Sequence, residues 1–295
     1  LPTLLKKQGY HSTFFHGGTN GTMSFDVFAK NAGFDEYIGR TEYAQDEDYD
    51  GTWGIWDEPF LQFTAKRLTQ EAQPFFSTVF TLSSHEPFVI PETYKNEAFA
   101  AYQGIFKGIS YSDIALRKFF ETASQQPWFA NTLFVITADH NFLACRDSLN
   151  YYNQGIGLYS IPVVFYQPGN KWLRGNYSAL FQQIDILPTV LDYVHYPSSF
   201  YAMGKSAFDT THVPYVFTNM DDYQQFYMGD YIYTWNDDNL NGIFHFPTDS
   251  TMQHSLLGRD TASTRYLPYF KAIKQQLVNG MIENRWLPST YLKPQ

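Results

Sequence analysis

Residues 75–87 read FFSTVFTLSSHEP, and residues 132–140 read TLFVITADH. In both stretches a short run of β-forming residues ends in polar side chains that include a histidine. Such runs, apolar nearly throughout, are typical of strands buried on both faces, as in a parallel sheet. Residues 10–18 (YHSTFFHGG) follow the same pattern, with His16 at the end of the predicted strand.

Helical patterns separate these strands. The spacing of apolar residues predicts helices over 1–9, 25–32, 57–73, 98–125 and 177–193. A further buried strand is expected at 161–166 (IPVVFY). Strands that alternate with long helices predict an α/β fold, with a mostly parallel sheet and helices on both faces. Ligands of such folds bind beyond the carboxyl ends of the strands, where the polar residues above are expected to lie.

The pattern changes after about residue 196. Short strands are expected at 213–217, 226–235 and 242–246, with a turn at 236–239 and a helix over 261–283. We interpret this part as a small α+β subdomain at 197–295. The main α/β domain is then 1–196. Before it, the acidic stretch 42–51 is expected to be a solvated loop.

Composition restricts the class of protein. The chain has 295 residues, of which 44% are hydrophobic and 17% charged, and this balance excludes a disordered chain. The net charge of -9, without a basic stripe, makes nucleic acid an unexpected partner. No apolar run reaches the roughly 20 residues that a membrane-spanning helix needs. The single cysteine, Cys145, excludes an internal disulfide and is expected to be a passive thiol.

Three histidine-bearing strand ends are the candidate site. Asp139 and His140 suit a divalent transition metal, although a capping aspartate beside a surface histidine would look the same. His16 and His85, taken singly, could each be a satisfied core or rim histidine. Ser83 lies outside any GxSxG elbow, so a serine nucleophile is not favoured. Together, the three ends predict one converging site.

Two tryptophans precede the second of these strands. Trp53 and Trp56 lie in the stretch WGIWDE and could line a pocket, although core packing is the commoner place for tryptophan. We expect Trp53 to contact the substrate.

An ordered set of short motifs carries a family resemblance. They are LP at 1–2, GY at 9–10, FFHG at 14–17, GFD at 33–35, WG at 53–54, DE at 57–58, TLSSHEPF at 81–88, YSD at 111–113 and ADH at 138–140. This set resembles the sulfatase-type branch of the alkaline phosphatase superfamily. Within that branch it is most similar to lipoteichoic acid synthases and periplasmic phosphoglycerol transferases. An alkaline phosphatase-like fold is therefore expected, with the first strands of the catalytic domain upstream of Leu1.

The resemblance implies a role for each candidate residue. Asp139 and His140 would be two ligands of a catalytic divalent metal. Mn²⁺ is the expected ion, with Zn²⁺, Mg²⁺ and Ca²⁺ as alternatives. His85 would be catalytic, contacting the phosphate or the leaving oxygen. His16 would line the headgroup pocket, together with His85 and Trp53.

The resemblance also implies a reaction. In the family, a threonine attacks the phosphodiester of phosphatidylglycerol, diacylglycerol leaves, and the phosphoglycerol group passes to a glycan or polymer hydroxyl. That threonine and a glutamate metal ligand would lie upstream of Leu1, so residues 1–295 alone are expected to have little or no activity. The implied location is extracytoplasmic, periplasmic or at the cell surface, with helices upstream anchoring the protein in the membrane.

Two alternatives stay open. Lipoteichoic acid synthases carry a tryptophan and an arginine shortly after the histidine and glycine of the headgroup pocket, whereas residues 18–26 here read GTNGTMSFD. A sulfatase or phosphodiesterase of the same superfamily is therefore an alternative. The other is a non-catalytic module that binds a glycan or a lipid headgroup.

Overall fold

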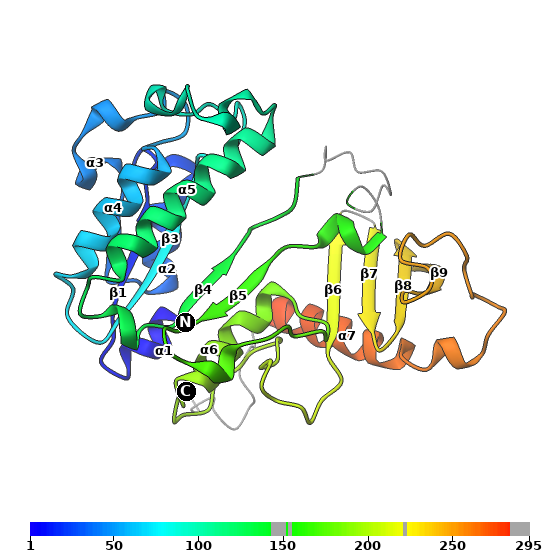
Figure 1. The fold of residues 1–295 in the computed structure, drawn as a ribbon. Coiled ribbons are helices and arrows are strands. Elements are labelled where there is room, and N and C mark those ends of the chain that lie inside the picture. Colours follow the sequence, from blue (N-terminus) through cyan, green and yellow to red (C-terminus); the bar gives the residue numbers. More distant parts are fainter. Residues whose placement is uncertain (143–151, 153–154, 221–222, 284–295) are drawn as a thin grey trace. The chain divides into compact units, whose positions relative to one another are not determined.

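The structure is a computed structural model that describes residues 1–142, 152, 155–220 and 223–283. Its contacts divide the chain into two compact units (Figure 1). The first unit comprises residues 1–136 and 163–174, and the second comprises 137–162 and 175–295. The boundary that the sequence predicts at residue 196 falls within the second unit. Cys145 lies outside the described residues.

A three-stranded parallel sheet is the centre of the first unit. β1 (His11–His16) lies between β2 (Glu36–Ile38) and β3 (Phe75–Phe80) and runs parallel to both. His16 is paired in register with Phe80. The carboxyl ends of β1 and β3 therefore meet at one edge of the sheet (Figure 1). β2 was not predicted, because three residues are too few to show a strand pattern.

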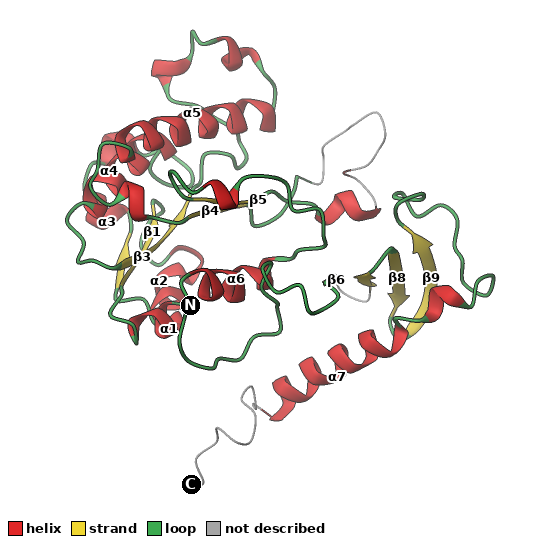
Figure 2. Ribbon diagram, turned by 60° about the horizontal axis from the view of Figure 1, so that its bottom comes forward, coloured by secondary structure: helices red, strands yellow, loops and turns green. Residues whose placement is uncertain are grey.

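Helices cover both faces of this sheet. The helices of this unit are α1 (Pro2–Lys6), α2 (Phe25–Ala32), α3 (Arg40–Tyr43), α4 (Asp57–Leu68) and α5 (Ile105–Ala123). Figure 2 shows α4 and α5 on one side of β1 and β3, and α2 on the other. The predicted α/β class, with helices on both faces of a parallel sheet, is confirmed.

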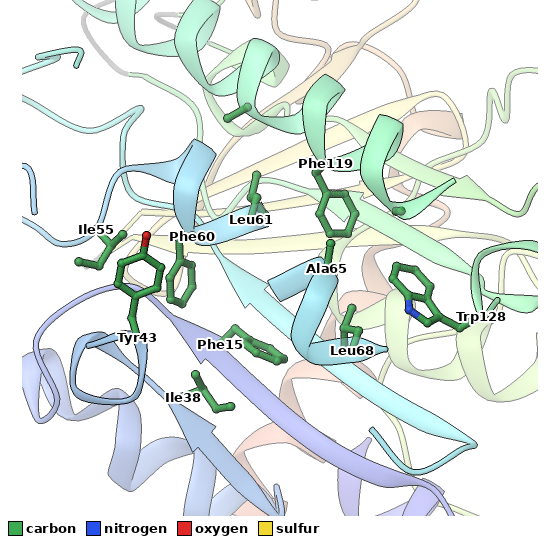
Figure 3. Packing of buried hydrophobic residues seen from close by; sticks show 12 residues of the cluster. Phe15, Ile38, Tyr43, Ile55, Phe60, Leu61, Ala65, Leu68, Phe119 and Trp128 are labelled. Atoms are coloured by element: carbon green, nitrogen blue, oxygen red, sulfur yellow. The ribbon is translucent and has the colours of Figure 1, made fainter. Parts of the chain in front are cut away.

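Two consecutive residues of β1 pack against the helices on opposite faces of the sheet. Phe14 contacts Phe25 and Phe28 of α2, each with a ring-centroid distance of 6.1 Å. Phe15 belongs to the opposite core, which includes Phe60 of α4 and Phe119 of α5 (Figure 3). Side chains alternate between the faces of a strand, so a continuous apolar run is buried only when both faces are covered.

Several predicted boundaries shift. α4 ends at Leu68 rather than at 73, and Pro74, which restricts only the residue before it, does not account for this earlier end. α5 begins at Ile105 rather than at 98, because Gly104 has a φ of 54° and interrupts the helix. Residues 98–101 form a separate 3₁₀ turn. The predicted loop 42–51 also contains a 3₁₀ turn, over 46–48.

The strand that carries the third candidate pair lies next along the chain. β4 (Phe134–Thr137) pairs with β5 (Val163–Tyr166) in a two-stranded sheet. Phe134 packs against Phe120 of α5, with ring centroids 5.0 Å apart. Both strands are where the sequence predicts them.

The second unit contains α6 (Ile186–Tyr193) and an antiparallel sheet with a long helix. The four strands of the sheet, in order, are β6 (Tyr215–Met220), β7 (Tyr223–Met228), β8 (Tyr231–Asn236) and β9 (Asn239–His245). α7 (Leu267–Glu283) contributes Phe270, which stacks on Trp235 at a centroid distance of 3.8 Å. The expected α+β character of this part is confirmed.

Two sequence predictions in this unit were wrong. The stretch 226–235 is not one strand, because the chain reverses between β7 and β8 at Gly229, whose φ of 58° suits a tight turn. Residues 177–193 are not one helix, because α6 begins only at Ile186. Asp185 accepts the backbone N–H of Gln182 at 2.9 Å and so caps the 3₁₀ turn that precedes α6. Among the described residues, no helix is long and apolar enough to cross a membrane.

Candidate active site

His85 lies on the turn that follows β3. The backbone N–H of His85 donates to the carbonyl of Leu82 at 3.1 Å, and the side chain is exposed. The ring Nδ1 lies 3.1 Å from the carbonyl oxygen of Glu86. A carbonyl can only accept, so this contact assigns the proton of the neutral ring to Nδ1 and leaves the lone pair on Nε2. Nε2 is therefore the atom of His85 that can take up or hold a transferred proton.

Trp53 donates a hydrogen bond to the same carbonyl. Its Nε1–H donates to the carbonyl of Glu86 at 2.6 Å, and its ring lies 4.1 Å from that of His85, tilted by 52°. The indole of Trp53 therefore packs beside the imidazole of His85, and both rings donate a hydrogen bond to the carbonyl of Glu86. The predicted contact between Trp53 and substrate stays a prediction.

A buried carboxylate fixes the start of this turn. Asp57, 2% exposed at the first residue of α4, accepts the backbone N–H groups of Leu82 at 2.8 Å and Ser83 at 3.1 Å. The hydroxyl of Ser112 donates to its second oxygen at 2.8 Å. Burial raises the pKa of Asp57, while these hydrogen bonds act in the opposite direction. The sequence analysis does not predict Asp57 as a site residue. The available signal is its position in the stretch WDE at 56–58, which precedes the strand that ends in the polar residues 83–86.

Ser83 takes a structural part in this arrangement. It is 4% exposed, and its hydroxyl oxygen accepts the backbone N–H of Asp57 at 3.0 Å. That Ser83 is not a nucleophile stays a prediction.

Two glycines let neighbouring segments approach the turn. A Cβ on Gly54 would lie 2.6 Å from the carbonyl oxygen of Gly17 and 2.6 Å from Leu82, so the loop that carries Trp53 is seated on both strand ends. A Cβ on Gly108 of α5 would lie 3.2 Å from the carbonyl oxygen of Ser83. Both contacts are closer than a side chain at these positions would easily allow, so the packing around His85 depends on glycine here.

His16, at the end of β1, is buried and neutral. It is 2% exposed, and its ring lies 4.2 Å from that of Phe25 and 5.7 Å from that of Phe80. Its Nδ1 is 2.9 Å from the hydroxyl of Tyr37. Burial lowers the pKa of His16 to about 4 and raises that of Tyr37 to about 12. Near neutral pH His16 can therefore supply a hydrogen bond but not a positive charge.

Asp139 and His140 follow the end of β4 after one intervening residue and belong to the second unit. Both are exposed, and Oδ2 of Asp139 lies 3.6 Å from Nε2 of His140. The Nδ1 of His140 is 2.7 Å from the carbonyl oxygen of Asn141, which assigns its proton to Nδ1 and leaves the Nε2 lone pair free for a ligand. Two ligand atoms about 2.0–2.2 Å from a tetrahedral ion are about 3.4 Å apart. The separation in this structure fits a pair that shares one divalent ion.

The structure groups the predicted residues as follows. His16, Trp53 and His85 lie in the first unit, where His16 ends β1, His85 follows the end of β3, and the ring of Trp53, from the loop before α4, lies beside that of His85. Asp139 and His140 lie in the second unit. Among the described residues, no group of three or more His, Cys, Asp or Glu side chains could hold a metal ion. Asp139 and His140 therefore offer two metal ligands. A small cavity of the second unit, lined by Asp185 and His212 among others, contains none of the predicted residues.

A family comparison accounts for this combination of fold and strand ends. The family model described as Sulfatase matches residues 1–196, so the chain belongs to the sulfatase family. Its fold is that of the alkaline phosphatase superfamily. The predicted resemblance is confirmed.

The curated relatives include two kinds of enzyme. Lipoteichoic acid synthase 1 of Bacillus subtilis is 26% identical over 211 residues, which cover 65% of this chain and 32% of the synthase. Phosphoglycerol transferase I of Salmonella paratyphi B is 26% identical over 254 residues, which cover 80% of this chain and 32% of the transferase. The chain thus spans about a third of the length of these relatives.

Solved structures share the fold. The lipoteichoic acid synthase LtaP from Listeria monocytogenes superposes with a TM-score of 0.75 at 20% identity, covering 98% of this chain and 74% of that one. A protein in the alkaline phosphatase superfamily from Vibrio parahaemolyticus superposes with a TM-score of 0.71 at 24% identity, covering 92% of this chain and 67% of that one.

Proposed function

We propose that the protein is a metal-dependent enzyme of the phosphoglycerol transferase type, which acts on the phosphodiester of a phospholipid headgroup. The proposal rests on family membership and on one geometric observation, the 3.6 Å separation between Oδ2 of Asp139 and Nε2 of His140. The curated relatives named as lipoteichoic acid synthase and phosphoglycerol transferase support this choice within the family. In the proposed reaction a threonine upstream of Leu1 forms a covalent phospho-threonine intermediate.

Asp139 and His140 would hold the metal, with Mn²⁺ as the first choice. When bound, the ion would lower the pKa of the nucleophile and neutralise charge on the phosphoryl oxygens. An aspartate oxygen and a neutral imidazole nitrogen are ligands that Mn²⁺ and Zn²⁺ both accept.

His85 would move the proton. With the threonine attacking as its alkoxide, the protonated His85 would donate from Nε2–H to the oxygen of the departing diacylglycerol as the threonine–phosphorus bond forms and the ester bond breaks. The neutral ring would then take a proton from the acceptor hydroxyl, whose oxygen displaces the threonine as its alkoxide. The carbonyl of Glu86 accepts from Nδ1 in both states, so the ring keeps one orientation through the cycle.

His16 would bind rather than titrate. With the hydroxyl of Tyr37 donating to Nδ1, the proton of the neutral ring would lie on Nε2, from which it could donate to an oxygen of the headgroup. A neutral donor suits a glycerol hydroxyl, whose recognition needs no charge.

The implied partners are a phospholipid headgroup and a glycan or polymer acceptor. The implied location is extracytoplasmic, with membrane association through helices upstream of Leu1.

A substrate panel on the protein that includes the chain upstream of Leu1 tests the proposal. Phosphatidylglycerol, a bis-aryl phosphodiester and an aryl sulfate are offered with Mn²⁺, and diacylglycerol, phenol and sulfate release are measured. Diacylglycerol release that is lost on His85→Gln supports the proposal. Turnover of the aryl sulfate alone would instead identify a sulfatase. No turnover, together with no Mn²⁺ or Zn²⁺ by elemental analysis, would identify a binding module.

A further inference from the structure

The side-chain amide of Gln183 clamps the backbone that carries the metal-ligand pair. Its Nε2 lies 3.0 Å from the carbonyl oxygen of Ala138 and 2.8 Å from that of Asp139. A carboxamide nitrogen has two hydrogens, so one group can satisfy both carbonyls. The sequence separation of about 45 residues makes this a tertiary contact within the second unit.

Gln183 is itself held by a capped turn. It begins the 3₁₀ turn Gln183–Asp185 that leads into α6. The carboxylate of Asp185, 6% exposed, accepts the backbone N–H of Gln182 at 2.9 Å and that of Lys205 at 2.8 Å. The side chain of Gln183 therefore projects from a backbone position that the cap at Asp185 fixes, just before α6.

The exposed pair needs such a support. The side chains of Asp139 and His140 are 60% and 75% exposed, so packing contributes little to where they point. Their direction depends on the backbone at 138–140. Two hydrogen bonds to consecutive carbonyls restrict that backbone just where both side chains leave it.

We propose that Gln183 is a positioning residue for the metal ligands Asp139 and His140. The inference rests on the proposed function, since it concerns the affinity of that pair for a divalent ion. Residues that support metal ligands from behind typically contribute a factor of about 10 to 100 in metal affinity. Gln183 holds backbone rather than a ligand side chain, so a factor of about 10, at the lower end, is expected.

The adjacent glutamine provides a matched control. Gln182 also makes two side-chain hydrogen bonds to backbone, but to β6: its Nε2 donates to the carbonyl of Tyr215 at 3.0 Å, and its Oε1 accepts from the N–H of Phe217 at 3.2 Å. Gln182→Met removes the same number of bonds as Gln183→Met at the next residue. It leaves the ligand pair untouched.

The first measurement is Mn²⁺ binding by electron paramagnetic resonance on the wild type and both variants, with His140→Ala as the reference for a lost site. Gln183→Met should raise the dissociation constant about 10-fold, and Gln182→Met should leave it within about twofold. Equal dissociation constants for wild type and Gln183→Met, with binding lost in His140→Ala, would overturn the inference.

The second measurement needs no metal. The ¹⁵N relaxation of the Asp139 and His140 amides should report lower order parameters in Gln183→Met than in wild type, and unchanged ones in Gln182→Met. Unchanged order parameters in Gln183→Met would overturn the inference whether or not the ion binds. Absence of Mn²⁺ binding in the wild type would count against the proposed function alone, because the relaxation result still decides the role of Gln183.

Discussion

Asp57 and Ser83 exchange two hydrogen bonds across 26 residues of sequence: the N–H of Asp57 donates to the hydroxyl of Ser83, and the N–H of Ser83 donates to the carboxylate of Asp57. The exchange joins the start of α4 to the turn after β3. His85 lies two residues beyond Ser83, so its position depends on these two hydrogen bonds.

Asp57→Ala should destabilise the fold and displace His85. The substitution leaves the N–H groups of Leu82 and Ser83 buried without an acceptor, at a cost of about 2–4 kcal/mol. Asp57→Asn keeps one carbonyl oxygen for these donors and should cost about 1 kcal/mol. Urea unfolding measures both, with the exposed Asp113→Ala as a control expected within about 0.5 kcal/mol. Equal stabilities of Asp57→Ala and Asp113→Ala would contradict the role of Asp57.

Gly108→Ala tests the close approach of α5 to the same turn. In an ordinary helix interior this change stabilises by up to about 1 kcal/mol. Here the new Cβ would lie 3.2 Å from the carbonyl oxygen of Ser83, so the turn or the helix must shift. We expect no gain in the free energy of unfolding and a several-fold loss of diacylglycerol release. A stabilised variant with full activity would show that the turn tolerates the methyl group.

Trp53→Phe separates the hydrogen bond of the indole from its ring contact. The phenyl ring still packs beside His85, but the N–H that donates to Glu86 is lost. Activity should fall about 10-fold while stability changes by no more than about 1 kcal/mol. Trp56→Phe, whose ring packs on Tyr111, is the control and should keep its activity.

The same variant has a spectroscopic readout. In ¹⁵N spectra of the histidine rings, Trp53→Phe should show His85 moving from the Nδ1–H form toward a mixture of the two tautomers. A ring that stays in the Nδ1–H form, with activity unchanged, would remove Trp53 from the positioning of His85.

His16 should give stability a dependence on pH. Its pKa is about 4 in the folded protein and 6.5 when unfolded, so between these values the unfolded chain binds more protons. Stability is therefore fully present above pH 6.5 and falls as the pH drops toward 4, by on the order of 2–3 kcal/mol. His16→Gln removes this contribution, and urea unfolding at pH 7 and pH 4.5 should show a smaller loss in the variant. Parallel losses would mean that His16 is not buried in its neutral form.

Local signals in the sequence located the strand ends. The apolar runs that become β1, β3 and β4 are recognisable because their sequences lack the apolar–polar alternation of a strand with one solvated face. α2 was predicted with the bounds it has, since Gly33, with a φ of 94°, ends it with a left-handed residue.

Tertiary contacts could not be predicted in the same way. Asp57 looks like any acidic residue in the first turn of a helix until Ser83 and Leu82 are placed against it. Gln183 falls within the helix that the sequence predicts over 177–193. The later start of α6 depends on the cap at Asp185, which involves the backbone N–H of Lys205 and therefore cannot be predicted from the local sequence. The assignment of Nδ1–H in His85 depends on the carbonyl of the following residue, which no spacing rule indicates.

The proposed phosphodiester transfer requires His85 of the first unit and, separately, the pair Asp139–His140 of the second. It is tested most directly by diacylglycerol release from phosphatidylglycerol vesicles with Mn²⁺, using the protein that includes the chain upstream of Leu1. His85→Gln and His140→Ala should each reduce the rate at least about 100-fold with unchanged melting temperatures. Release at the wild-type rate by either variant would contradict the account.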